Sequence, residues 1–171
     1  MRPRHPVPRQ WLMTDQRMGD ALWTALAALP RGSGVVVRHH GLPLAERRLL
    51  LARIERIGRK RRLVVLGAGM PASGGIHNGR RGARGLLSRA VHDRRELVAA
   101  MRSRADCVFV SPVFATRSHP GARPLGPVRL GLLIRGFVVP VVALGGMDAS
   151  RLRRLRPLPI QGWAAIDAWL R

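Results

Sequence analysis

The chain has 171 residues, a net charge of +22 and one cysteine, Cys107. This length allows one domain with its own core, so we expect residues 1–171 to form a single domain. The charge indicates anionic partners such as phosphate esters, nucleic acid or a membrane surface, while one cysteine excludes a disulfide within the chain. No run approaches the roughly 18 apolar residues of a membrane span, and the first ten residues lack the apolar part of a signal peptide. We therefore expect a cytoplasmic protein.

Short apolar runs alternate with amphipathic segments along the chain. In chain order we expect a strand at 11–15, a helix at 19–29, a strand at 35–38, a helix at 43–57, strands at 63–66, 75–77 and 87–91, a helix at 93–102, a strand at 108–113, a helix at 128–135, a strand at 139–144, a helix at 148–155 and a strand at 160–166. Gly58 is expected to end the second of these helices. The alternation predicts a parallel α/β fold.

Eight strands with about five helices predict a trimmed (β/α)₈ barrel, because the complete fold usually needs about 250 residues. The segment 67–74 is too short for a crossover helix of the usual length. The segment 79–85 is rich in glycine and arginine where another helix would be expected. The third and fourth helices are therefore expected to be reduced or missing.

Two strands end in segments suited to binding an anion. The strand at 108–113 leads into a loop with serine, threonine, arginine and histidine, and the strand at 139–144 leads into Gly145 and Gly146. Two glycines let backbone N–H groups approach a phosphate closely. Phosphate sites of (β/α)₈ barrels commonly follow the seventh and eighth strands, so this pattern favours a phosphate-binding barrel.

Three segments resemble the thiamine phosphate synthase/TenI family. Residues 111–122 resemble its G/S-P-x-F-x-T-x-S/T-K/H-P-G-A loop, residues 143–147 its A-I/L-G-G-I/M strand end, and residues 90–97 its S-V/T-H-S-x-x-E-L/A segment. They occur in the family's order and close to its spacing, from about Leu87 onward. The resemblance implies a reaction that joins hydroxymethylpyrimidine pyrophosphate to a thiazole phosphate. Pyrophosphate leaves with the help of Mg²⁺, and thiamine phosphate forms.

The resemblance also implies a cradle for the phosphate of the thiazole. Its members would be two hydroxyls, two glycines and one backbone position: Thr116, Ser118, Gly145, Gly146 and Ile166. The alternative is an ordinary polar loop whose hydroxyls cap turns. Asp167 stands where the family commonly has a small serine. It would repel a phosphate unless it points away or pairs with an arginine.

On the pyrophosphate side, Arg38 matches the arginine of the family's Q-x-R-x-K strand, and His40 stands in place of its lysine. His119 stands where a lysine or histidine closes the loop at 111–121. Arginine and protonated histidine can both bind an anion, so Arg38, His40 and His119 are substrate-binding candidates. The alternative for His39 and His40 is a solvated turn between a strand and a helix.

The magnesium ligands of the family have no counterparts here. The family has Asn-Asp at the end of its third strand, where this chain reads Gly67-Ala68, and residues 75–81 contain no acid. Asp15 and Asp20 lie elsewhere in the sequence. Because Mg²⁺ binds through hard oxygen ligands, usually one or two carboxylates, we expect no metal site and no cofactor.

His92 matches the histidine that TenI-type thiazole tautomerases use as an acid–base catalyst. The alternative is a histidine that merely precedes a helix cap. Three functions therefore stay open: a synthase-like transferase, a tautomerase-like isomerase using His92, and an inactive phosphate- or polyanion-binding homologue. The expected partner is a phosphorylated thiazole. Nucleic acid is disfavoured, because the arginines are dispersed and are not interleaved with aromatic residues. A homo-oligomer stays open, and no membrane partner is expected.

Overall fold

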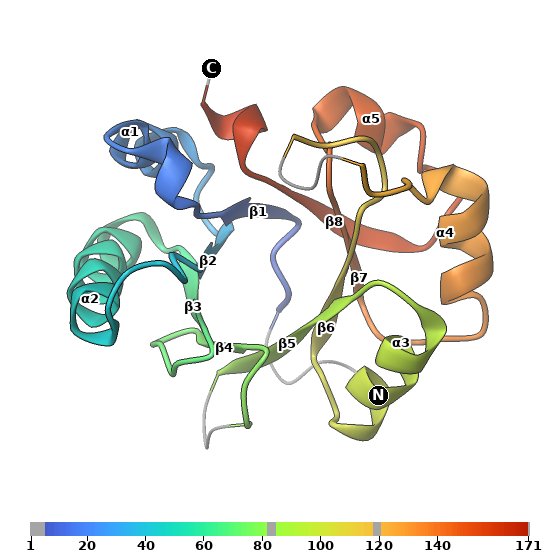
Figure 1. The fold of residues 1–171 in the computed structure, drawn as a ribbon, viewed down its shortest axis with the longest axis horizontal. Helices are drawn as coiled ribbons and strands as arrows, with labels where there is room; N and C mark the ends of the chain where they lie inside the picture. The colour runs from blue at the N-terminus through green and yellow to red at the C-terminus, as the bar shows by residue number, and fades with distance from the viewer. Residues whose placement is uncertain (1–5, 82–84, 118–120, 171) are drawn as a thin grey trace.

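The computed structural model describes residues 6–81, 85–117 and 121–170, and its eight parallel strands close into a barrel in sequence order (Figure 1). The strands are β1 (Gln10–Met13), β2 (Gly34–Val37), β3 (Val64–Ala68), β4 (Gly75–His77), β5 (Leu86–Val91), β6 (Cys107–Val110), β7 (Val141–Leu144) and β8 (Ile160–Ala165). The helices are α1 (Ala21–Ala28), α2 (Leu44–Arg61), α3 (Arg94–Arg102), α4 (Gly126–Ile134) and α5 (Ala149–Arg153), with short 3₁₀ turns η1 (Gln16–Met18) and η2 (Asp167–Trp169). The predicted trimmed (β/α)₈ barrel is confirmed.

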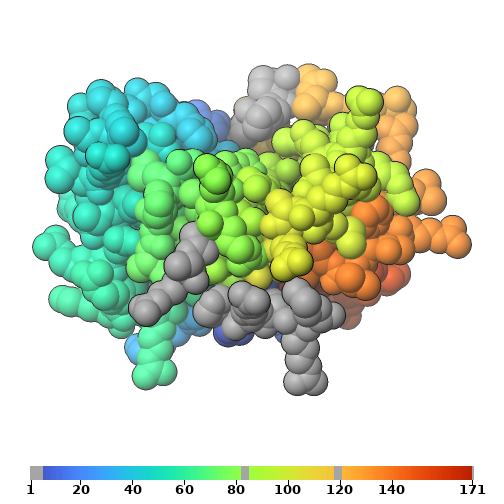
Figure 2. Space-filling view, turned by 90° about the horizontal axis from the view of Figure 1, so that it is seen from below, coloured from blue at the N-terminus to red at the C-terminus, as the bar shows by residue number. Residues whose placement is uncertain are grey.

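The barrel lacks a complete outer ring of helices. In Figure 1, α1 and α2 cover one side and α3, α4 and α5 the other, while β4 and β5 lie between these groups without a helix outside them. The described residues between β3 and β4, and those between β4 and β5, form no helix. Figure 2 views this side directly, and the green atoms of the β4–β5 region reach the surface between α2 and α3. The expected loss of the third and fourth helices therefore holds for the described part of the chain.

The predicted end of α2 was wrong. The helix continues through Gly58 to Arg61, and Arg62 takes a left-handed conformation as its C-cap. Gly58 is buried, and its Cα faces Val65 of β3. This glycine therefore serves close packing between helix and strand instead of ending the helix. Smaller differences occur elsewhere: β6 ends at Val110, β7 begins at Val141 and α5 ends at Arg153.

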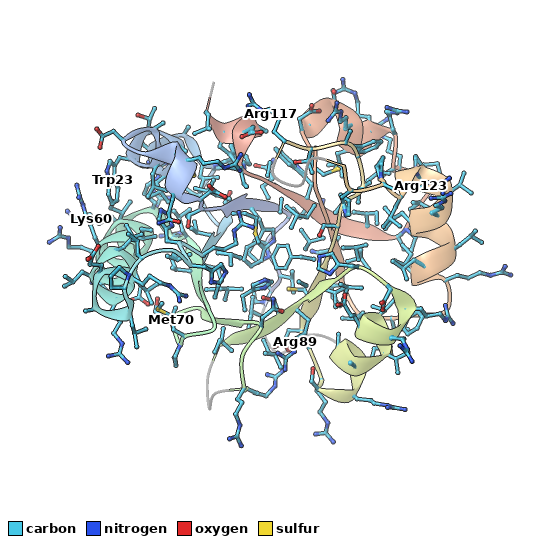
Figure 3. All side chains as sticks on the ribbon, in the orientation of Figure 1. Trp23, Lys60, Met70, Arg89, Arg117 and Arg123 are labelled. Atoms are coloured by element: carbon cyan, nitrogen blue, oxygen red, sulfur yellow. The ribbon has the colours of Figure 1, made fainter. Side chains whose placement is uncertain are left out.

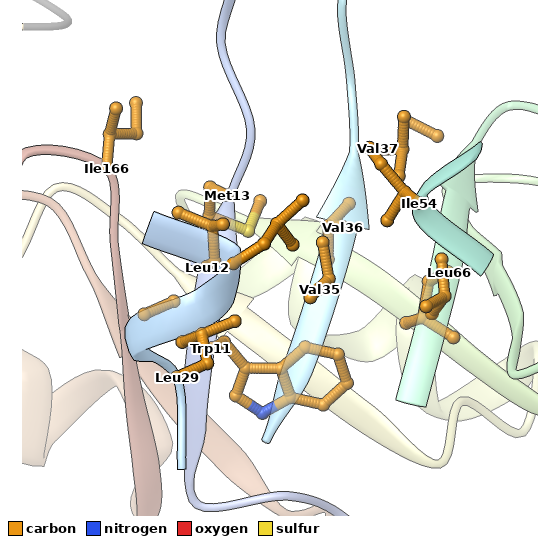
Figure 4. Close-up of a cluster of buried hydrophobic side chains, with 14 of the residues drawn as sticks. Trp11, Leu12, Met13, Leu29, Val35, Val36, Val37, Ile54, Leu66 and Ile166 are labelled. Atoms are coloured by element: carbon orange, nitrogen blue, oxygen red, sulfur yellow. The ribbon is translucent and has the colours of Figure 1, made fainter. Parts of the chain in front are cut away.

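Aromatic side chains fill the interior of the barrel. The rings of Trp11 and Phe109 are fully buried and meet edge to face with centroids 5.1 Å apart. Figure 4 shows Trp11 among the valines of β2 and the surrounding aliphatic side chains. Gly34 makes this packing possible, because a Cβ there would lie 2.0 Å from the indole ring.

No helix in the described residues is long and apolar enough to cross a membrane.

Candidate functional site

A cavity of about 530 Å³ lies at the carboxyl ends of the strands. The segments after β2, β5, β6, β7 and β8 all contribute to its wall. The lining residues that the sequence analysis had singled out as binding or catalytic are Arg38, His92, Thr116, Gly145, Gly146 and Ile166. His40 does not line this cavity, and Ser118 and His119 lie outside the described residues. The structure thus brings most of the predicted residues to one place.

The loops after β6 and β7 are joined by backbone hydrogen bonds. The amide of Val113 donates to the carbonyl of Leu144 over 2.9 Å, and the amide of Phe114 donates to the carbonyl of Gly145 over 3.0 Å. Gly145 and Gly146 both have positive φ, at 91° and 59°. A Cβ on Gly146 would lie 2.3 Å from the carbonyl oxygen of Ala115. Only glycine allows the two loops to approach this closely.

Asp167 does not stand unpaired at the cavity. Its carboxylate accepts a hydrogen bond from Nε of Arg117 over 3.3 Å, so the ion pair links the β6 loop to η2. Figure 3 shows Arg117 beside η2, whereas Lys60 lies on α2 and Arg123 lies in the segment before α4. Because Arg117 offsets the carboxylate charge, one of the two conditions under which Asp167 tolerates a phosphate is met.

Arg151 is a cavity residue that the sequence analysis missed. Its backbone amide donates to Asp148, which caps α5, and its guanidinium donates to the carbonyl of Gly146. Hydrogen bonds from Arg151 and Ser150 lower the pKa of Asp148. The only sequence signal was an arginine three residues after a helix cap, a position from which a long side chain can reach back over the loop.

Asp15 holds Arg38 in place, although it lies far from Arg38 in the sequence. The guanidinium of Arg38 donates to Asp15 over 3.1 Å and to the carbonyl of Thr14 over 3.1 Å. Asp15 also accepts hydrogen bonds from Arg17, which lower its pKa the most. The strand order explains the pairing, because β1 and β2 are neighbours. Asp15 therefore belongs to the barrel mouth and orients a cavity-lining cation.

Glu96 orients the imidazole of His92. The ring Nδ1 and the backbone amide of His92 lie 2.9 Å and 2.6 Å from the same Glu96 oxygen. An ionised carboxylate can only accept hydrogen bonds, so this pairing favours the tautomer with the proton on Nδ1 and a lone pair on Nε2. Asp93 caps α3 by accepting a hydrogen bond from the amide of Glu96. His92 is exposed at the cavity rim instead of being packed behind this cap.

The remaining histidines have different environments. His39 is buried, with Nδ1 2.9 Å from the hydroxyl of Thr14, whereas His40 is exposed at the start of the next turn. His77 is buried inside the barrel, where Nδ1 lies 2.9 Å from the hydroxyl of Ser88. Burial, with a smaller contribution from Arg38, lowers the pKa of His77 to about 4. His77 is therefore neutral at pH 7. Its burial inside the barrel was not anticipated from the sequence.

The carboxyl ends of β3 and β4 offer no acidic ligands. β3 ends at Ala68 and β4 at His77, and the next described residues are also without a carboxylate. Across the part of the chain that the structure describes, no three histidine, cysteine, aspartate or glutamate side chains group in a way that could hold a metal ion.

A model of the thiamine monophosphate synthase family matches residues 77–169. This match spans more than half of the chain. The protein belongs to the thiamine monophosphate synthase family. The resemblance found in the three sequence segments is thereby confirmed, and the match runs from β4 to η2.

Individual relatives agree with this assignment. The thiamine-phosphate synthase of Chloroflexus aurantiacus is 31% identical over 84 residues, which cover 48% of this chain and 39% of that protein. The thiamine-phosphate synthase of Pyrococcus furiosus is 28% identical over 83 residues, 48% of this chain and 40% of that protein. The matched segment therefore spans less than half the length of these two curated relatives.

Solved structures extend the likeness of the fold to nearly the whole chain. Thiamine phosphate pyrophosphorylase from Pyrococcus furiosus superposes with a TM-score of 0.78 at 20% identity, covering 95% of this chain and 87% of that one. N-acetylmannosamine-6-phosphate 2-epimerase from Clostridium perfringens superposes with a TM-score of 0.56 at 12% identity, covering 94% of this chain and 86% of that one. At these identities the likeness concerns the fold.

Proposed function

We propose that this protein binds a phosphorylated thiazole at the carboxyl end of its barrel, as a member of the thiamine-biosynthetic family. The observation that carries the proposal is the single cavity formed by the β6 loop, the β7 loop and the end of β8. Thr116 offers a hydroxyl, and Gly145 and Gly146 offer backbone in conformations that bring N–H groups close to an anion. Arg38 and Arg151 add positive charge to the same cavity.

The residues present do not fit the magnesium ion of the family reaction. Mg²⁺ needs hard oxygen ligands, and the ends of β3 and β4 supply none in the described residues. Asp15 follows β1, which β2 separates from β3, and its carboxylate is already bonded to Arg17 and Arg38. We therefore propose that release of pyrophosphate is not the reaction of this chain.

A second candidate function is isomerisation of the bound thiazole, favoured by the His92–Glu96 pair at the cavity rim. Tautomerisation removes a proton at one atom and returns it at another, which one imidazole can do without a metal. With Nδ1 held by Glu96 over 2.9 Å, Nε2 would take up the proton and give it back. The imidazolium formed between the two steps would be stabilised by the Glu96 carboxylate.

The binding proposal can be tested by calorimetric titration with a thiazole phosphate. Gly146→Ala should abolish measurable binding, because the added Cβ would meet the Ala115 carbonyl at 2.3 Å and separate the loops. Gly136→Ala is the matched control. Gly136 also has a positive φ, of 81°, but nothing lies within 4 Å of its missing Cβ. Equal affinity in the two variants would contradict the proposed cradle.

A further inference from the structure

The register of the barrel brings together the ends of three neighbouring strands on the side away from the proposed phosphate cradle. Val37 of β2 pairs with Gly67 of β3, and Ala68 pairs with His77 of β4. Arg38 follows Val37 directly, so it lies at the level of Ala68. This part of the mouth therefore has Arg38 beside the end of β3, where a metal-binding acid is missing.

A second arginine reaches the same strand end from α2. The guanidinium of Arg47, in the first turn of that helix, donates to the carbonyl of Ala68. Its Nε–H is buried and has no hydrogen-bond partner among the residues described. Charged donors without partners are rare in protein interiors, because leaving one unpaired is costly.

The charges of both arginines act on the imidazole of His40. Partial desolvation lowers the pKa of the exposed His40, and the nearby charges of Arg47 and Arg38 lower it further. The same two arginines also disfavour the charged form of His39. Asp15 is the acid that counters them, through its bond with Arg38. Positive charge therefore exceeds negative charge at this end of β2 and β3.

We infer that Arg47 takes the place of a metal ion, so that a phosphate or pyrophosphate group binds between Arg38, His40 and Arg47 without a divalent cation. A guanidinium is a fixed charge with several donors that suit phosphate oxygens. A divalent cation beside Arg47 would be repelled by that charge and would find no carboxylate in the described residues at this end of β3. The inference rests on the proposed function only in taking the barrel mouth as the ligand site.

The test is a calorimetric titration of the protein with inorganic pyrophosphate, in EDTA and in Mg²⁺. We expect binding in EDTA, with no gain when Mg²⁺ is present. Arg47→Met should weaken that binding by about tenfold or more, as expected for a lost charged hydrogen bond. Arg48→Met is the matched control, because it removes the same charge from the exposed neighbouring position. It should leave the affinity nearly unchanged.

Two results would overturn the inference: binding that requires Mg²⁺, or equal weakening by the two variants. If circular dichroism shows that Arg47→Met is unfolded, Arg47→Lys decides, because it keeps the charge but loses the planar fork. The affinity of Arg47→Lys for pyrophosphate should then be lower than that of Arg48→Lys. Thiazole phosphate binding separates this inference from the proposed function. Gly146→Ala should abolish thiazole phosphate binding, and Arg47→Met should leave it unchanged. The phosphate cradle and the Arg47 site can therefore be refuted independently.

Discussion

The buried imidazole of His77 should make the protein less stable in mild acid than at neutral pH. The pKa of His77 falls from its ordinary value of 6.5 to about 4 in the folded state, mainly through burial. The unfolded chain therefore binds a proton between these values that the folded chain does not. The contribution of neutral His77 to stability is complete above pH 6.5 and decreases as the pH falls towards 4. At 1.36 kcal/mol per pKa unit, the loss is about 2 kcal/mol at pH 5 and about 3 kcal/mol below pH 4.

Urea unfolding of the wild type and of His77→Gln, each at pH 7.5 and pH 5, measures this contribution. Glutamine does not titrate and can still bond the hydroxyl of Ser88. Between pH 7.5 and pH 5, we expect the free energy of unfolding to fall by about 2 kcal/mol more in the wild type than in His77→Gln. Equal losses in His77→Gln and the wild type would refute the reasoning.

Three further substitutions test the site and the core. His92→Ala should slow interconversion of thiazole tautomers by about 10²–10⁴ if the isomerase function is right, while phosphate affinity stays unchanged, and full activity would leave His92 structural. Asp167→Asn should tighten thiazole phosphate binding by about two- to fivefold, because it releases Arg117 from its partner, and weaker binding in a titration would contradict this. Gly34→Ala should cost about 1–3 kcal/mol of unfolding free energy or prevent folding, because its Cβ would lie 2.0 Å from the Trp11 ring, and an unchanged urea midpoint would argue against that packing.

The order of the secondary-structure elements could be predicted because each carries a local signal. Buried parallel strands appear as short apolar runs, and Asp93 and Asp148 mark helix starts through the side-chain caps that they form. Gly58 shows where local signals mislead. A glycine near the end of an amphipathic run is typical of a helix end, yet here it lies against Val65 of a distant strand. Tertiary packing decided its role.

Most of the predicted site residues gathered in one cavity because the family motif locates loops, and the barrel places successive loops side by side. The partners of those residues were not predictable in the same way. Asp167 lies 50 positions from Arg117, and Asp15 lies 23 positions from Arg38. Such pairs depend on the register and closure of the barrel, which composition and spacing do not reveal. Arg47 was missed for the same reason, since only the fold brings it to β3.

The central claim is that the loops after β6 and β7 hold one phosphate. A crystal structure of the protein soaked with a thiazole phosphate tests it most directly. We predict phosphate density within hydrogen-bond distance of the Thr116 hydroxyl and of backbone amides at Gly145 and Gly146, inside the cavity that these loops enclose. Phosphate density bound elsewhere on the barrel, with this cavity empty at saturating ligand, would contradict the account.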